Sequence, residues 1–253
     1  MAEKMWCLKR CGLFSRLAPD QIQRIELRSR SRSYSAHSPI YLPTQKADSV
    51  FVLTSGLVKV CHLTPEGKEL ILAFVEPGEL FGELAIFSGH ARDEYVEAVS
   101  QSTVVMIPVE EMDLLMSERA DVAMGITKII GLRRQRIERR LKNLLFKSNR
   151  ERLIHLLLDL AQQFGWEADD GIHLRVRLSH QDLASLIGST RESVTVLLNQ
   201  LKSEGTIHNG RRKVVLTNPA RLARSVNRQP PDNIKFTNTF LRGFAQAISS
   251  CAH

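Results

Sequence analysis

The sequence has no long hydrophobic stretch, few cysteines, and little glycine or proline. Its longest uninterrupted apolar run is Leu70–Val75, far shorter than the roughly 20 residues needed to cross a bilayer. Four cysteines in 253 residues exclude a disulfide-stapled mini-protein, and 14 Gly with 9 Pro exclude a low-complexity chain. Charges also occur near the N-terminus, where a secretory signal would be apolar. We therefore expect a folded cytoplasmic protein with free thiols and no membrane partner.

The residue patterns of common catalytic and metal sites are also missing. The eight histidines include no His-x-His pair of the kind that a cupin metal site needs. Neither a Gly-x-Ser-x-Gly motif nor a glycine-rich phosphate loop occurs. We predict that the chain is not an enzyme, has no catalytic residues and has no metal site.

Positive charge is concentrated in the second half of the chain. Residues 1–120 contain 13 Lys and Arg against 16 Asp and Glu, a net charge of −3, whereas residues 121–253 contain 22 against 11, a net charge of +11. Such asymmetry is typical of a chain whose basic half has a polyanionic partner. Nucleic acid is favoured over a membrane surface, because the basic stretches lack a strongly apolar opposite face, apart from one helix that we assign to dimerisation.

The first half has the pattern of a small antiparallel β-domain followed by helix. Short apolar runs between turns favour a sandwich or jelly roll, and they lie at residues 50–53, 57–61, 70–75 and 103–107. From Glu110 to about Phe146 there is no proline and only two glycines interrupt, which predicts one long helix or two helices with a break.

The long helix carries a row of apolar residues with heptad-compatible spacing, which predicts pairing with a second copy of the chain. This row consists of Ile126, Ile130, Ile137 and Leu144. Arg133 and Arg140 occupy the intervening positions. Either these arginines extend to solvent, or they contact an anion at the dimer interface.

Two helix-capping signals follow each other closely in the basic half. Ser179-His-Gln-Asp182 predicts an N-cap and a short helix that Gly188 ends, and Ser189-Thr-Arg-Glu192 predicts a second helix capped by Ser189. Residues 207–216 then have Asn209-Gly210 between strand-like flanks, which predicts a hairpin. A helix, a tight turn, a helix and a basic hairpin form a DNA-reading unit with a wing.

The start of the second helix would then contact base edges in a major groove. Arg191 can bind guanine O6 and N7 together, and Glu192 can accept from cytosine N4. The alternative, that both form only a surface pair, fits poorly with the capped helix before them and the basic wing after them. The predicted DNA-binding residues are Ser179, Thr190, Arg191, Glu192, Ser193 and the phosphate-binding Arg211, Arg212 and Lys213.

Together these features resemble the CRP/FNR family of bacterial transcription regulators. The resemblance covers about residues 13–222 and rests on Pro77-Gly-Glu-Leu-Phe-Gly-Glu-Leu-Ala-Ile-Phe87 and on Leu178-Ser-His-Gln-Asp-Leu-Ala-Ser-Leu-Ile-Gly-Ser-Thr-Arg-Glu-Ser-Val194. It implies an α+β fold with a jelly-roll sensor domain of the cyclic-nucleotide-binding type, a long dimerisation helix and a winged helix-turn-helix. The corresponding boundaries are 1–110, 111–147 and 148–218, with a C-terminal extension at 219–253.

The resemblance implies a homodimeric activator that binds palindromic double-stranded DNA, contacts RNA polymerase and responds to a small anionic effector. Val196 stands where many members have another arginine, so base preference should differ there. The alternative class is a ligand-sensing regulatory subunit that acts on a protein partner, but such a subunit needs neither the basic half nor the reader helix. The implied effector site consists of Phe81, Gly82, Glu83, Leu84, Arg92, Arg133 and Glu138.

Two effectors fit different parts of that site. Members that bind cyclic nucleotides have a glutamate after Phe-Gly, here Glu83, and an Arg-Ser pair at the phosphate, but here Asp93 follows Arg92 and would repel the phosphate. Cyanobacterial global nitrogen regulators, which sense 2-oxoglutarate, are similar at Arg133 and Glu138, although their second arginine falls at Glu94. We expect 2-oxoglutarate ahead of a cyclic nucleotide, with an effector-independent regulator as the alternative.

The cysteines suggest two further sensor types, and both fit poorly. An iron–sulfur sensor needs four ligands, whereas Cys7, Cys11 and Cys61 leave only Cys251 in the tail. Cys61 and His62 could bind haem, but neighbouring residues on a strand point to opposite faces. We interpret the cysteines as buried or incidental thiols.

Overall fold

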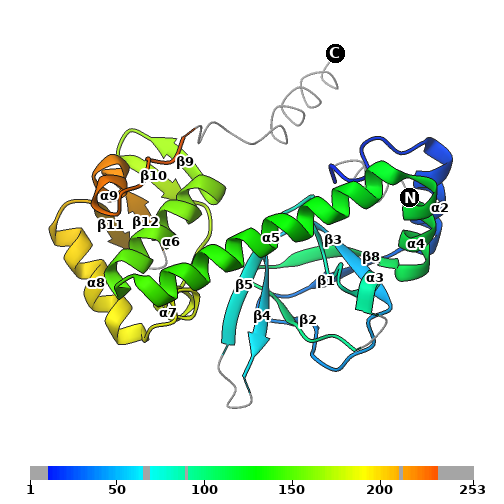
Figure 1. Cartoon of the computed structure of the whole chain (residues 1–253), viewed down its shortest axis with the longest axis horizontal. Helices are drawn as coiled ribbons and strands as arrows, with labels where there is room; N and C mark the ends of the chain where they lie inside the picture. The colour runs from blue at the N-terminus through cyan, green and yellow to red at the C-terminus, as the bar shows by residue number, and fades with distance from the viewer. Residues whose placement is uncertain (1–10, 65–68, 89–90, 211–212, 233–253) are drawn as a thin grey trace. The chain divides into compact units, whose positions relative to one another are not determined.

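The computed structural model describes residues 11–64, 69–88, 91–210 and 213–232. The chain divides into two compact units, which meet in sequence after Arg139. Figure 1 shows strands of the first unit in blue and cyan and helices of the second in green and yellow.

The N-terminal unit is built on two four-stranded antiparallel sheets. One sheet has the order β1-β8-β3-β6 (Arg30–Tyr34, Ser102–Pro108, Ser49–Ser55 and Leu80–Phe81). The other has the order β2-β7-β4-β5 (Pro39–Tyr41, Tyr95–Ala98, Val58–Leu63 and Glu69–Val75). The predicted β-sheet sensor domain is therefore confirmed, because β3, β4, β5 and β8 contain the four apolar runs.

Alternating side chains of these strands form the core of the sensor domain. Phe51 and Phe81 stack with their ring centroids 5.1 Å apart, and Tyr41 stacks on Phe51 at 5.3 Å. A second apolar cluster packs helices against the first sheet, since Ile22, Val105 and other side chains in it are almost completely buried. These helices are α2 (Pro19–Arg28), α4 (Val109–Glu118) and the beginning of α5 (Ala120–Phe146), and the short α3 (Ala85–Ser88) follows β6.

The long helical region contains two helices with a break at Arg119, which is one of the two predicted outcomes. Helix α5 also corrects the predicted dimer row. Ile126 is fully buried in the core of this unit, so it cannot meet a second chain, and the partly buried Ile130 packs against the same core. The exposed apolar side chains of α5 lie mostly further along the helix: Met124, Leu132, Ile137, Leu141, Leu144, Leu145 and Phe146.

The C-terminal unit combines helices with a second four-stranded sheet. Its helices are α6 (Asn149–Phe164), α7 (His180–Ile187), α8 (Arg191–Ser203) and α9 (Pro219–Ser225). Its sheet has the order β11-β12-β10-β9 (Ile207–Gly210, Lys213–Leu216, Gly171–Leu174 and Gly165–Ala168). Buried leucines and isoleucines of α6, α7 and α8 form its core.

The residues after the wing return to α6. Arg228 donates to the backbone oxygen of His155 at 3.3 Å and to the Asp159 carboxylate at 2.6 Å. Gln162 donates to the backbone oxygen of Asp232 at 2.9 Å. The described start of the predicted C-terminal extension is therefore attached to the same unit as the helix-turn-helix.

Candidate functional site

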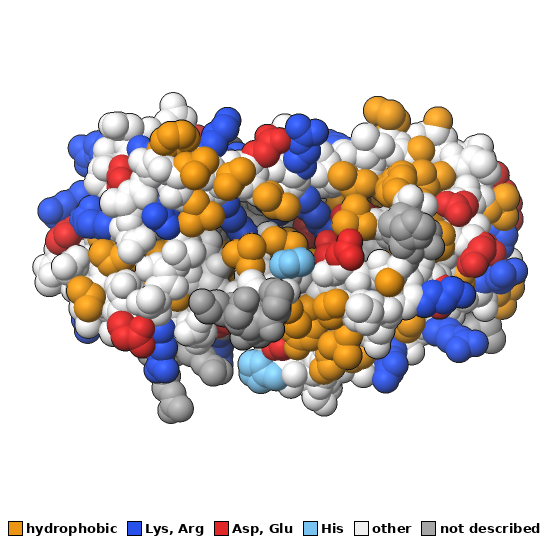
Figure 2. All heavy atoms as spheres, turned by 60° about the horizontal axis from the view of Figure 1, so that its bottom comes forward, with side chains coloured by type: hydrophobic (Ala, Val, Ile, Leu, Met, Phe, Trp, Pro, Cys, Tyr) orange, Lys and Arg blue, Asp and Glu red, His pale blue; other side chains and the backbone are white. Residues whose placement is uncertain are grey.

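Basic side chains alone do not mark the site. Figure 2 shows one face of the molecule, on which Lys and Arg side chains are spread among hydrophobic patches and acidic side chains rather than forming one continuous basic surface. The site is therefore defined by the geometry of particular helices and side chains.

The turn between α7 and α8 is built from short polar residues and one glycine. Ser179 caps α7, because its hydroxyl accepts from the Asp182 amide at 3.1 Å while the Asp182 carboxylate accepts from the Ser179 amide at 2.7 Å. Gly188 ends α7 in the left-handed conformation, with φ +62°. This conformation favours glycine, and a Cβ at this position would also lie 2.7 Å from the end of the Leu144 side chain, which would have to shift.

The cap of α8 differs from the prediction by one residue. Thr190, not Ser189, is the N-cap, and its hydroxyl accepts from the Ser193 amide at 3.2 Å. Ser189 still belongs to the end of α7, because its amide donates to the Ala184 carbonyl at 3.0 Å. Helix α8 therefore begins at Arg191.

The wing also has a different register from the predicted one. Asn209 pairs with Val214 and Gly210 with Lys213. Asn209-Gly210 is therefore part of strand β11 and does not form the two-residue turn that its sequence favours. Arg211 and Arg212 connect the two strands in the chain and lie outside the described residues.

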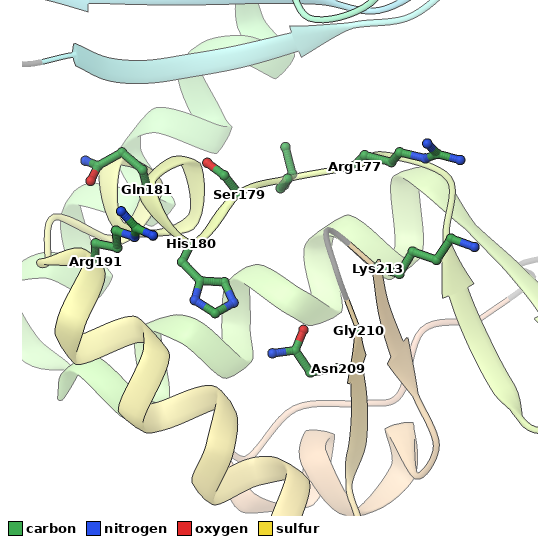
Figure 3. Close-up of a pocket in the computed structure, with 9 residues that line it drawn as sticks. Arg177, Ser179, His180, Gln181, Arg191, Asn209, Gly210 and Lys213 are labelled. Carbon is green, nitrogen blue, oxygen red and sulfur yellow. The ribbon is translucent and has the colours of Figure 1, made fainter.

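A cavity of about 1020 Å³ lies between the start of α7, the start of α8 and the wing. Figure 3 shows the side chains around it. Of the predicted DNA-binding residues, it brings together Ser179, Arg191 and Lys213, and Thr190, Glu192 and Ser193 lie at the adjoining helix start. No acidic side chain is among its lining residues, which are Arg177, Leu178, Ser179, His180, Gln181, Arg191, Asn209, Gly210 and Lys213.

Sequence reasoning missed four polar residues of this cavity, namely Arg177, His180, Gln181 and Asn209. His180 and Gln181 follow the predicted cap Ser179 directly, so the capping signal itself marks them as the exposed first turn of a helix. Asn209 was missed because it was assigned to a turn. Its position in β11 instead directs its side chain into the cavity (Figure 3).

Arg152 of α6 connects the helix-turn-helix to the end of α5. Its guanidinium donates to the Lys147 carbonyl at 2.9 Å and to the Ile187 carbonyl at 3.1 Å. One side chain thus satisfies a free carbonyl at the end of α5 and another at the end of α7. Leu144 of α5 lies against Gly188 in the same region, so the α7–α8 turn is held by both helices.

In the sensor unit, the predicted effector residues form internal contacts. Arg133 of α5 forms an ion pair with the buried Glu83 and donates to the Leu80 carbonyl at 2.6 Å. Arg92 is 8% exposed, donates to the Ser49 carbonyl at 2.5 Å and lies 4.1 Å from the Tyr41 ring centroid. Gly82 is needed beside it, because its φ is +68° and a Cβ would lie 3.0 Å from Arg92.

Glu94 takes part in this cluster. Burial raises the pKa of Glu94 above its usual value, while the hydrogen bond from Tyr41 and the nearby Arg133 and Arg92 act in the opposite direction. The Tyr41 hydroxyl donates to the Glu94 carboxylate at 2.9 Å. The position that would carry a second arginine in a 2-oxoglutarate site therefore adds a carboxyl group to the cluster.

Two predicted residues lie away from the buried cluster. Glu138 pairs with Arg134 on the surface of α5 at 2.8 Å, and Leu84 is 46% exposed. A cavity of about 200 Å³ is lined by Gly82, Leu84, Arg92, Asp93 and Glu94 among others. A larger cavity of about 600 Å³ lies beside α5, and its charged lining residues are Arg16, Glu79, Asp121, Lys128, Arg133 and Arg136.

The described cysteines have the environment of unreactive thiols. Cys11 and Cys61 are free and buried, and burial raises the pKa of Cys11 to about 11. Cys61 is buried whereas His62 is exposed, as strand alternation predicts. Cys7 and Cys251 lie outside the described residues. Within the described ranges, no three His, Cys, Asp or Glu side chains could together hold a metal ion, and no helix is both long and apolar enough to cross a membrane.

Comparison with known proteins assigns both units. A model of the cyclic nucleotide-binding domain matches residues 31–119, and a model of the Crp-like helix-turn-helix domain matches residues 151–225. The global nitrogen regulator of Synechocystis sp. is 30% identical over 76% of this chain and 86% of its own length. The CRP-like cAMP-activated global transcriptional regulator of Mycobacterium tuberculosis is 24% identical over 86% of this chain and 97% of its own length.

A solved structure agrees with these matches. A CooA variant from Carboxydothermus hydrogenoformans superposes with a TM-score of 0.69 at 26% identity, covering 79% of this chain and 88% of that one. Sensor domain, long helix and helix-turn-helix together define a DNA-binding transcription regulator. The chain belongs to the CRP/FNR family. The resemblance stated from the motifs is thereby confirmed, and the relatives are transcription regulators rather than enzymes.

Proposed function

We propose that the protein is a homodimeric, sequence-specific activator that binds palindromic DNA in the cytoplasm and contacts RNA polymerase. The observation that carries this proposal is the cavity at the start of α8, which Arg177, Arg191 and Lys213 line with no acidic side chain among the lining residues. Cations at a helix N-terminus beside a wing match the charge and shape of a DNA major groove. Domain limits of 1–110, 111–147, 148–218 and 219–253 belong to the same proposal.

The test is selection of binding sites from random double-stranded DNA by the full-length protein. We expect an enriched palindrome whose half-sites are about 10 base pairs apart between centres, because two-fold related reader helices lie about 34 Å apart. Affinity for this site should fall steeply with salt concentration, since lysines and arginines displace counterions. Enrichment of no site, or tight binding to a single half-site by a monomer, would contradict the proposal.

We further propose that a small anion is the effector and that it binds at Arg133, with 2-oxoglutarate ahead of a cyclic nucleotide. Four cations line the larger cavity, which suits a dicarboxylate. Its two acids already have partners, because Glu79 accepts from the Glu76 amide and Asp121 pairs with Arg119. The smaller cavity at Arg92 includes Asp93 and Glu94, and this arrangement disfavours a cyclic phosphate.

Calorimetric titration separates these effectors. We expect 2-oxoglutarate to bind the wild type and Lys142→Ala alike, and to bind Arg133→Ala about 10- to 150-fold more weakly, the usual worth of a hydrogen bond to a charged group. Lys142 is an exposed cation of α5 that does not line the cavity, which makes it a matched control. Heat from cAMP alone would reverse the order of the two effectors. No heat from either ligand would favour the effector-independent alternative.

A further inference from the structure

His180 lies in the DNA-facing cavity with its two ring nitrogens in different surroundings. It is the first residue of α7, and its ring lies between α8 and the strand that carries Asn209 (Figure 3). Its Nδ1 is 2.8 Å from the Thr195 hydroxyl. Within the described residues, the Nδ1 atom of this ring has a hydrogen-bond partner and the Nε2 atom has none. The Nε2 atom is therefore the one available to a ligand.

The Thr195 hydroxyl determines which ring nitrogen carries the proton. This hydroxyl lies 2.8 Å from the Arg191 carbonyl oxygen, which can only accept, so its single proton is used there. The same oxygen can then only accept from His180, and Nδ1 must be the donor. A neutral His180 consequently has a bare acceptor at Nε2, whereas a protonated His180 has a second N–H there.

The charged groups around the ring come from every side of the cavity. Arg177 precedes α7, Arg191 begins α8 and Lys213 begins β12, and all three line the same cavity. Asp182, the acid of α7 nearest in sequence, is bonded to the backbone and hydroxyl of Ser179 at 2.7 and 2.6 Å. A phosphate bound at Nε2 would place a negative charge beside the ring, which favours the protonated form of an imidazole.

We propose that His180 binds a DNA phosphate through Nε2 as the imidazolium, so that DNA binding takes up one proton in each subunit. A neutral ring would present an acceptor to a phosphate oxygen, which is also an acceptor, so protonation is required for a hydrogen bond. His180 is thus a phosphate-binding residue whose contribution depends on pH. This inference rests on the proposed DNA-binding function and adds a residue and a linked proton to it.

The experiment measures binding of the selected palindrome by fluorescence anisotropy between about pH 5.5 and pH 8.5 at constant ionic strength. For the wild type, we expect affinity to rise as pH falls, by up to about tenfold per pH unit for each subunit. His180→Asn retains a donor to Thr195 without Nε2, and His180→Gln places a neutral amide near the Nε2 position. Both variants should lose this pH dependence, because neither an asparagine nor a glutamine side chain takes up a proton in this range.

The matched control is His173→Gln. His173 belongs to the same unit, pairs with Asp170 at 2.6 Å and stacks on Trp166, but it does not line the cavity. This variant should retain the wild-type pH dependence. A pH-independent wild type, or an unchanged slope in His180→Gln, overturns the assignment of His180 while leaving DNA binding intact. Absence of DNA binding by the wild type at every pH would instead overturn the proposed function.

Discussion

Arg191→Ala should retain DNA binding but lose discrimination at one base pair of each half-site. Arg191 is the first residue of α8 and lines the cavity between α7, α8 and the wing, and an arginine at the start of a reader helix can bind guanine O6 and N7 together. Removal of such a contact lowers discrimination against the other bases by about 1–3 kcal/mol, or roughly 5- to 150-fold. Competition binding with the selected palindrome and its single-base variants would measure this loss.

Lys213→Ala provides the comparison, because a phosphate contact behaves differently from a base contact. Lys213 lines the same cavity from strand β12. Its loss should weaken all sequences alike and reduce the salt slope by about one unit. Arg212→Ala should act in the same way, although Arg212 lies outside the described residues. If Arg191→Ala binds every base variant with wild-type ratios, Arg191 is not a base reader.

The helix-turn-helix was predictable because its signals are local. The Asp182 amide donates to the Ser179 hydroxyl, and the Ser179 amide donates to the Asp182 carboxylate. Both bonds lie within one turn of helix, so four consecutive residues specify the start of α7. The predicted cap of α8 was one residue early because Ser189 and Thr190 are both good capping residues. Ser189 belongs instead to the end of α7, because its backbone amide donates to the Ala184 carbonyl.

Features that depend on long-range packing were less predictable. Ile126 fits a heptad row, but the sensor core buries it completely beside residues more than 100 positions away in sequence, such as Ile22. The local sequence Asn209-Gly210 favours a turn. The register of β11 is determined instead by its pairing with β12, which in turn pairs with β10. The ion pair of Glu83 with Arg133 likewise joins residues 50 positions apart. Residue type suggested that each could contact a ligand, and the fold shows that they also contact each other.

The exposed part of α5 leads to the second large prediction. Leu141 is 54% exposed and Leu145 is 67% exposed, one helical turn apart. Ile137, one turn before Leu141, is 44% exposed, so these three residues form an apolar stripe on a helix that is otherwise rich in arginine. A single chain leaves this stripe in water, whereas a second copy of α5 would cover it.

Leu141→Glu should therefore convert the proposed dimer to a monomer. Full burial of an exposed leucine contributes about 1.5–3 kcal/mol, and about half of this is available to Leu141, which is 54% exposed in the single chain. Because a two-fold interface contains two copies, the dissociation constant of the dimer should rise by about 10- to 150-fold, and a buried carboxylate would add to this. Sedimentation velocity would detect the monomer, and affinity for the palindrome should fall with it, because one chain reaches only one half-site.

Leu27→Glu is the matched control for this substitution. Leu27 is 73% exposed on α2, so the same change adds the same charge and removes a similarly exposed side chain outside α5. It should remain dimeric and bind DNA as the wild type does. At a protein concentration low enough for the wild type to be monomeric, both variants should melt at nearly the wild-type temperature, because neither side chain is buried in the single chain. A Leu141→Glu protein that remains dimeric would show that the two copies meet elsewhere, and the apolar stripe on α5 would then not be the dimer interface.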